Sequence, residues 1–302
     1  MKEKEFISII KSTLNSQYIG DDCAYLKDLG IVITQDNLVE DIHFTRKTIT
    51  PFQLGYKSIM VNLSDVASSG AEPAYLTVSL SLPQDIDKNF IKEFYDGCKN
   101  ACGKDVEIVG GDITGADKIF ISVCAIGKSL NRNISSRKNA KVGQKIIVSG
   151  NHGSSAAGLA ILNNQIECFD KERFIKAHLM PKAQIEFGQK VSIMVQTPYA
   201  MMDTSDGLMD ALLTIAKESG VCMEVDFGKI PHEKGLEQFE NWQDMILFGG
   251  EDYQLLACVP KDFEYGLTVG KVKNGFGVDL ILNSKTVNYT EKNIENKLFN
   301  HF

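Results

Sequence analysis

The stretch TPFQLGYKSIMVNLSDVASSGAEP, residues 50–73, decides how the first half of the chain folds. Thr50 suits an N-cap, Pro51 suits the first helical position, and Gln53 completes a capping box. A Gly-Ala-Glu-Pro sequence then marks the far end. We therefore predict a helix over residues 51–69. Apolar residues occupy most of its circumference, which is typical of a helix buried on nearly all sides.

One narrow polar stripe interrupts this apolar surface. Ser58, Asn62, Asp65 and Ser69 recur at helical spacing, so they share a face. A carboxylate that faces a protein interior costs several kcal/mol unless a cation or hydrogen-bond donors meet it. A lone acid is most often an N-cap or half of a salt bridge, but Asp65 lies late in its helix, where the macrodipole disfavours negative charge. The stripe therefore favours a metal ion or a cleft at Asp65.

The rest of the chain alternates short strands with helical patterns, which predicts a mixed α/β (α+β) fold. Strands are expected at 31–34, 74–82, 119–127, 145–150, 221–227 and 253–259, and further helices at 88–102, 154–164, 182–196 and 207–219. The polar run 128–144 lacks periodicity and is the best candidate for a boundary. We divide the chain into an N-terminal domain, 1–137, and a C-terminal α/β domain, 138–302.

Composition narrows the class of protein. The chain has 302 residues and a formal net charge of −7, which gives no support to a nucleic-acid partner. It shows no signal peptide and no apolar run long enough to span a bilayer, so no membrane association is expected. Its seven cysteines are scattered without a CxxC pair, which is typical of reduced core residues in a cytoplasmic protein.

Acidic residues gather in short turns that follow apolar strands. These acids are Asp21 and Asp22, Asp36, Asp112, Asp203 and Asp206, and Glu251 and Asp252. Singly, each is explained by an Asx turn or a helix cap, and Asp206 is expected to cap the helix that follows it. Together they indicate a shared site, because the ends of strands in α/β folds converge on one edge of the sheet. Oxygen-only ligands suit Mg²⁺ or Mn²⁺.

Magnesium in turn suggests a nucleotide, but the common nucleotide motifs are absent. The sequence has no GxxxxGK[ST] loop and no protein-kinase signature, and GLTVGKV at 266–272 has the wrong spacing for a phosphate loop. NHGSSAAGLAIL at 151–162 is at most a generic anion site at a helix N-terminus. A nucleotide site in this chain must therefore be dominated by metal ions.

Six motifs in order resemble the thiamine-monophosphate kinase family: GDDCA, ITQDNLVEDIHF, KSIMVNLSDVASSGAEP, GGDITG, MMDTSDGL and GGEDYQLL. That family belongs to the superfamily of aminoimidazole ribonucleotide synthetase and selenophosphate synthetase. The resemblance runs from about Gly20 to the C-terminus. It implies ATP-dependent phosphorylation of thiamine monophosphate, and a two-domain fold like that of aminoimidazole ribonucleotide synthetase. It also implies a homodimer whose N-terminal strands pair into a barrel.

The resemblance also assigns residues to three roles. It implies metal ligands, for several Mg²⁺ ions per site, at Asp22, Thr34, Gln35, Asp36, Asp65, Asp112, Asp203 and Asp206. It implies contacts to ATP, the co-substrate, at Tyr95, Gly111, Asp112, Arg137 and Ser205. It implies acceptor contacts at His43, Glu251 and Phe299. No dedicated catalytic base is expected, because an acceptor phosphate with a second pKa near 6 is already mostly deprotonated at neutral pH.

Three departures from the family pattern bear on the acceptor. Gln35 stands where Thr is common, so a backbone carbonyl ligand would survive there but a hydroxyl ligand would not. GGDITG lacks the Arg that often follows it, and the tail has Leu298 and Asn300 where Gly and Asp are usual.

Three alternative functions remain open from the sequence. One is a superfamily enzyme that acts on another acceptor, although selenophosphate synthetase would need a reactive Cys in a glycine-rich N-terminal loop, and Cys23 lies instead inside GDDCA. Another is a non-catalytic protein that binds a nucleotide or thiamine phosphate. A structural Ca²⁺ protein is the third, without EF-hand spacing to support it.

Overall fold

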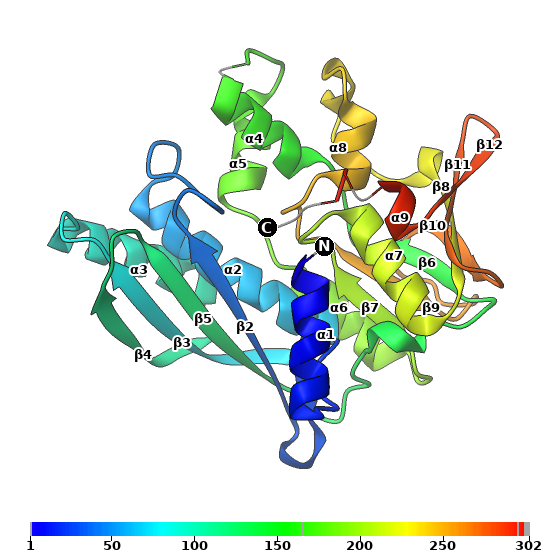
Figure 1. The fold of residues 1–302 in the computed structure, drawn as a ribbon, viewed down its shortest axis with the longest axis horizontal. Helices are drawn as coiled ribbons and strands as arrows, with labels where there is room; N and C mark the ends of the chain where they lie inside the picture. Colours follow the sequence, from blue (N-terminus) through cyan, green and yellow to red (C-terminus); the bar gives the residue numbers. More distant parts are fainter. Residues whose placement is uncertain (1, 165, 295, 299–302) are drawn as a thin grey trace.

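The computed structural model describes residues 2–164, 166–294 and 296–298. Two β-sheets occupy its two halves, on the left and right of Figure 1. The first sheet has the strand order β1-β2-β5-β3-β4, and only β3 and β4 run parallel. Its strands are β1 (Ala24–Leu26), β2 (Ile31–Val39), β3 (Glu72–Leu82), β4 (Glu107–Gly115) and β5 (Phe120–Lys128).

The second sheet has the order β12-β11-β8-β10-β6-β9-β7, and only β8 and β11 run parallel. Its strands are β6 (Lys145–Val148), β7 (Ala200–Asp203), β8 (Cys222–Asp226), β9 (Leu255–Val259), β10 (Leu267–Lys273), β11 (Gly277–Leu282) and β12 (Lys285–Tyr289).

The α-helices are α1 (Lys2–Leu14), α2 (Pro51–Ser69), α3 (Lys88–Cys102), α4 (Ser154–Asn164), α5 (Lys171–Leu179), α6 (Ile185–Met194), α7 (Leu208–Ser219), α8 (Trp242–Phe248) and α9 (Glu291–Ile294). Short 3₁₀ turns are η1 (Lys27–Leu29), η2 (Arg137–Asn139), η3 (Phe227–Lys229) and η4 (Leu236–Gln238). Within the described chain, none of these helices is both long and apolar enough to cross a membrane.

Helix α2 begins and ends where its sequence predicts. The Thr50 side chain accepts a hydrogen bond from the backbone N–H of Gln53, and the Gln53 side chain accepts one from the backbone N–H of Thr50, so the capping box is complete. Gly70 ends the helix in the left-handed conformation, with φ of 82°. Most of its residues are buried, as the apolar circumference predicts.

Among the residues that the structure describes, helices cover one face of the first sheet and leave the other open. Leu76, Val78 and Leu80 of β3 point toward α2 and α3 and are buried, while Thr77 and Ser79 point to the other face and are partly exposed. Both helices lie on the same side of this sheet (Figure 1). The uncovered face carries a mixture of polar and apolar side chains, which is typical of a surface that another element covers.

The second sheet is covered on both faces. On β6, Ile146 and Val148 belong to a core that includes residues of α4, α7 and α8, while Ile147 belongs to a core with α6. Helix α6 also packs directly on α2, because a Cβ at Gly188 would lie 2.0 Å from the carbonyl oxygen of Ala67. Only glycine permits this approach. The contact places α2, and with it Asp65, beside the second sheet.

The mixed α/β class and every helix and strand predicted from the sequence are confirmed. Their ends shift by a few residues at most, except that the strand predicted at 31–34 continues to Val39. Three acids lie in strands rather than in the predicted turns, and one of them, Asp203, is the last residue of β7. Asp36 lies within β2, and Asp112 lies within β4, which runs through all three glycines of GGDITG.

The chain passes from the first sheet to the second between Lys128 and Lys145, within the polar run. The domain boundary near residue 138 remains a prediction.

Candidate active site

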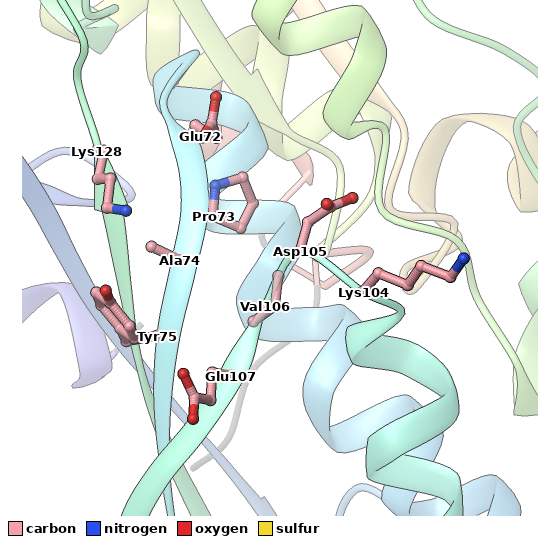
Figure 2. A pocket seen from close by; sticks show the side chains of 9 residues that line it. All are labelled: Glu72, Pro73, Ala74, Tyr75, Lys104, Asp105, Val106, Glu107 and Lys128. Carbon is pink, nitrogen blue, oxygen red and sulfur yellow. The ribbon is translucent and has the colours of Figure 1, made fainter.

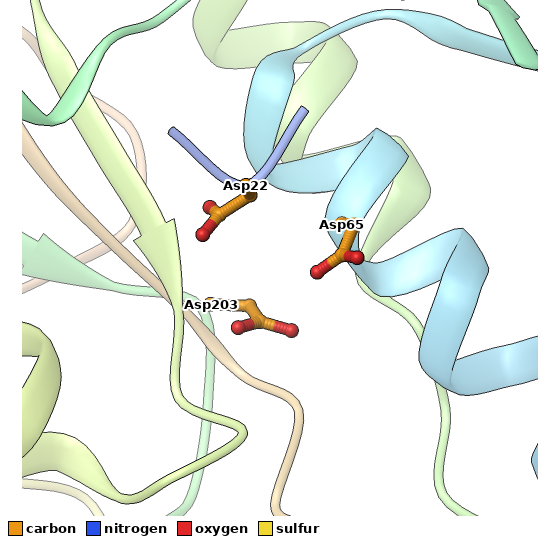
Figure 3. A group of neighbouring side chains, drawn as sticks. All are labelled: Asp22, Asp65 and Asp203. Atoms are coloured by element: carbon orange, nitrogen blue, oxygen red, sulfur yellow. The ribbon is translucent and has the colours of Figure 1, made fainter. Parts of the chain in front are cut away.

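Three carboxylates from distant segments meet between the two sheets. Asp22 precedes β1, Asp65 lies in α2, and Asp203 ends β7. One oxygen atom from each lies within 4.8 Å of the others, and the three side chains point toward one another (Figure 3). This spacing suits a shared divalent cation.

Hydroxyl groups surround these carboxylates. Thr34 Oγ1 donates to Asp65 Oδ2 at 2.6 Å, and Ser64 Oγ donates to Asp203 Oδ2 at 2.6 Å. The Ser68 hydroxyl donates to Asp22. These donors fix the orientation of the carboxylates, and a carboxylate oxygen that accepts one hydrogen bond keeps a further lone pair for a cation.

The carboxylates repel one another in a buried setting. Burial raises the pKa of Asp65 well above its ordinary value, and nearby Asp36 and Asp203 raise it further, while the hydrogen bond from Thr34 opposes the shift. Burial and nearby Asp22 raise the pKa of Asp203 to about 7, against the hydrogen bond from Ser64. A divalent cation would relieve this repulsion.

A partly buried cation lies at the edge of the cluster. The guanidinium of Arg137 contacts Asp22. Burial by itself lowers the pKa of Arg137, but the charge and hydrogen bond of Asp22, together with the charges of Asp203 and Asp21, outweigh burial and raise it. Asp21 holds the preceding turn, since its carboxylate accepts hydrogen bonds from the Arg137 N–H at 2.7 Å and from the Ser136 hydroxyl at 2.8 Å.

Strand β2 presents its three predicted metal ligands on different faces. Thr34 reaches Asp65, and the backbone N–H of Asp36 donates to Asn62 Oδ1 of α2 at 2.9 Å. Gln35 points to the opposite, uncovered face, where its amide donates to Ser122 Oγ at 3.0 Å. The Gln35 side chain is therefore outside the acidic cluster, and only its backbone carbonyl is a candidate ligand.

The turn after β7 brings Ser205 and Asp206 near the cluster. The Ser205 hydroxyl donates to Asp203 Oδ1 at 2.9 Å. The predicted helix cap at Asp206 is wrong in position, because the N-cap of α7 is Gly207. Asp206 lies one residue before this N-cap, and its side chain is exposed.

Two of the predicted acceptor residues lie near each other. His43 accepts a hydrogen bond at Nδ1 from the Val39 N–H at 3.0 Å, which turns the ring toward its own loop. His43 is also close enough to Glu251 to help lower the pKa of that carboxyl. Phe299 lies outside the described residues.

The other predicted ATP residues lie apart from the cluster in a single chain. Asp112 pairs with Ser79 in the edge strand β4, three strands away from β2. At about 4.8 Å per strand, that is a separation of about 14 Å. Gly111 has a structural reason to be glycine, because its Cβ would lie 1.8 Å from the Val78 carbonyl oxygen.

Tyr95 also lies elsewhere. It is in α3, where its ring meets Phe94 edge to face at 5.4 Å between centroids. Helix α3 packs on the first turns of α2, with Gly97 against Phe52 and Tyr56. Asp65 is nine residues beyond Tyr56, or about 13 Å along the helix.

The residues that hold Glu251 were not predicted from the sequence. Its carboxylate pairs with Lys57 Nζ of α2 at 3.0 Å and lies 3.3 Å from Nδ1 of His178 in α5. The sequence does indicate that Lys57 is paired, because a lysine within a helix predicted to be buried needs a partner. No pattern in the sequence indicates a role for His178, because its partner Glu251 lies far away in the sequence.

The chain matches known proteins over most of its length. Residues 20–129 match the family model "AIR synthase related protein, N-terminal domain", and residues 141–274 match the corresponding C-terminal domain model. The chain is 37% identical over 286 residues to the thiamine-monophosphate kinase of Aquifex aeolicus, covering 90% of this chain and 92% of that protein. It is 35% identical over 255 residues to that of Bacillus subtilis, covering 81% and 78%.

A solved structure agrees with these matches. The complex of AaThiL with AMPPCP and TMP superposes with a TM-score of 0.89 at 35% identity, covering 100% of this chain and 98% of that one. The structural likeness therefore extends over both sheets and the acidic cluster between them.

Proposed function

The chain belongs to the thiamine-monophosphate kinase family, and from that premise we propose that it transfers the γ-phosphoryl group of ATP to thiamine monophosphate, giving thiamine diphosphate and ADP. The AMPPCP and TMP bound by AaThiL support both substrates. The observation that carries the proposal is the meeting of Asp22, Asp65 and Asp203 within 4.8 Å. Two polyanionic substrates need such a site for cations, because like charges 4 Å apart repel by about 4 kcal/mol at an effective dielectric of 20.

The donor set fits magnesium. All its side-chain donors are oxygen atoms, and burial together with the nearby charge of Asp22 raises the pKa of Asp203 to about 7. We assign Mg²⁺ binding to Asp22, Asp65 and Asp203, with Asp36, Asp206, Thr34 and the Gln35 carbonyl as further candidates. Bound Mg²⁺ would neutralise phosphate oxygens and orient them in line.

The chain's own groups then bind and orient the substrates. Arg137 and Ser205, both beside the cluster, would contact the ATP phosphates. Transfer would be direct, because the acceptor phosphate needs no strong base. Burial raises the pKa of Cys23 well above its ordinary value, so its thiol stays protonated and is a poor nucleophile. This disfavours chemistry that runs through a cysteine.

A homodimer would complete the site. Strand β4 is an edge strand, and Val109 and Ile113 are 56% and 62% exposed on it. Such an edge offers unpaired backbone groups to another strand. We propose that two copies pair their first sheets into a barrel over the uncovered face, and that Asp112 of the partner subunit reaches the ATP site. A cytoplasmic location is also proposed, supported by seven free cysteines.

An ATPase-coupled assay tests the function. We expect ADP release with thiamine monophosphate and Mg²⁺, and none with thiamine, with the pyrimidine precursors of thiamine or without a divalent cation. Mass spectrometry of the product should show thiamine diphosphate. ADP release with aminoimidazole precursors or selenide but not with thiamine monophosphate would instead support a related enzyme. Tight nucleotide binding without turnover would indicate a regulatory binding protein.

A further inference from the structure

A buried lysine links the two halves of the chain at the proposed acceptor site. Lys57 lies in α2, and only 1% of its side chain is exposed. Its ammonium lies 3.0 Å from Glu251 Oε1, in the turn between α8 and β9. Lysine is almost never fully buried unless it is paired. The pair is therefore a required part of this junction.

The second oxygen of Glu251 is also held. Nδ1 of His178 lies 3.3 Å from Glu251 Oε2 and 3.0 Å from the Ser155 hydroxyl. Burial and the nearby charge of Lys57 lower the pKa of His178 to about 4, so this imidazole is neutral. Of these two buried neighbours of the Glu251 carboxylate, only Lys57 therefore carries a positive charge.

The backbone of Glu251 is fixed as well. Its φ is +65°, a conformation that side chains other than glycine rarely adopt. Its N–H donates to the Ser205 carbonyl at 2.7 Å, next to the acidic cluster. Strained backbone of this kind is maintained when the surroundings over-determine it, and it gathers at binding sites.

These contacts limit what Glu251 can offer a ligand. A quarter of its side chain is exposed, while its charge is already balanced by Lys57. A balanced carboxylate is a weak counterion but still has lone pairs that accept hydrogen bonds. It would therefore recognise a donor group better than it recognises a positive charge.

Resting on the proposed function, we infer that Lys57 is a positioning residue for acceptor recognition: it fixes Glu251 as a charge-balanced hydrogen-bond acceptor. The acceptor is then selected by a neutral N–H donor, the exocyclic amine of its pyrimidine, and not by its cationic thiazolium. Lys57 itself does not touch the acceptor.

Two analogues of thiamine monophosphate separate these features. The desamino analogue keeps the thiazolium but replaces the amine with hydrogen, and the thiophene analogue keeps the amine but has no positive charge. Calorimetric titration of wild-type protein should give a Kd at least about tenfold higher for the desamino analogue, because the buried acceptor would be left unpaired. The thiophene analogue should bind within about threefold of the parent, a small effect for a charge that is already balanced.

Lys57→Met tests the positioning role. We expect the Kd for thiamine monophosphate to rise about tenfold, the preference over the desamino analogue to shrink, and the Kd for ATP to change less than about twofold. Lys92→Met is the matched control, since it breaks an exposed lysine–aspartate pair on α3 and should change neither Kd. The double variant Lys57→Met/Glu251→Gln removes both charges and should fold even if the single variant does not.

Each outcome has one meaning. If the wild type binds thiamine monophosphate and its desamino analogue equally, or if Lys57→Met keeps the full preference for the amine, the inference is overturned while the proposed function stands. Weak binding of the thiophene analogue alone would also overturn it. If the wild type binds none of the three ligands, the proposed function fails together with the inference.

Discussion

The Ser64 hydroxyl donates a 2.6 Å hydrogen bond to Asp203, although the two residues are 139 positions apart in the sequence. Both side chains are buried. The bond joins α2, which packs on the first sheet, to the end of β7 in the second. The geometry of the acidic cluster therefore depends on how closely the two halves of the chain pack.

Replacing Ser64 with alanine should weaken this junction. The change leaves a buried carboxylate oxygen without its donor, so we expect the free energy of unfolding to fall by about 1–3 kcal/mol. Urea denaturation measures it. Ser58→Ala is the control, since the Ser58 hydroxyl is equally buried but bonds only the Leu54 carbonyl of its own helix. Equal losses in both variants would contradict a special role for the Ser64 bond.

Asp65→Asn should abolish phosphoryl transfer and leave the protein folded. The substitution removes negative charge from a cluster that burial and mutual repulsion already destabilise, so metal-free stability should be unchanged or higher. Turnover should fall at least about a thousandfold if the carboxylate holds a metal ion. Circular dichroism checks that the variant is folded, and a Mn²⁺ titration measures its metal binding alongside the turnover assay. Wild-type turnover by the purified variant would refute a metal role for Asp65.

A buried histidine should make the fold sensitive to acid. His152 is completely buried, and among the described residues neither ring nitrogen has a hydrogen-bond partner. Burial lowers the pKa of His152 to about 4, although the nearby backbone of Gly150 partly opposes the shift. Between about pH 6.5 and pH 4 the unfolded chain binds a proton that the native protein does not bind, so stability falls as the pH falls.

His152→Leu should remove this contribution. The variant should be as stable as wild type or more stable at pH 7, and its advantage should grow by about 2–3 kcal/mol as the pH falls from 6.5 to 4. Denaturation at several pH values measures the difference. His232→Leu, at a partly exposed histidine that pairs with Glu237, should give no growing advantage. A pH-independent difference for His152→Leu would show that the native ring takes up its proton over the same pH range as the unfolded chain, so that burial does not lower its pKa.

Local signals in the sequence predict α2, its capping box and the unusual setting of Asp65, because caps and apolar periodicity act within a few residues. The pair of Lys57 with Glu251 was not predicted, since it depends on packing between remote segments. Asp112 was placed in a turn because two glycines precede it. In the structure Gly111 instead permits close contact with the Val78 backbone, and the strand continues through it.

Mixing two inactive variants tests whether the active site is shared between subunits. Asp112 lies about 14 Å from β2 across the first sheet, while Asp65 belongs to the cluster beside Asp203. If Asp112 acts in the partner's site, Asp65→Asn and Asp112→Asn homodimers are both inactive, but their heterodimer contains one intact site. Random reassembly would then recover about a quarter of wild-type activity. Refolding the two variants together, with each refolded alone as the control, gives the measurement. No recovery in a mixture that sedimentation shows to be dimeric would place Asp112 and Asp65 in the same subunit's site or remove Asp112 from catalysis.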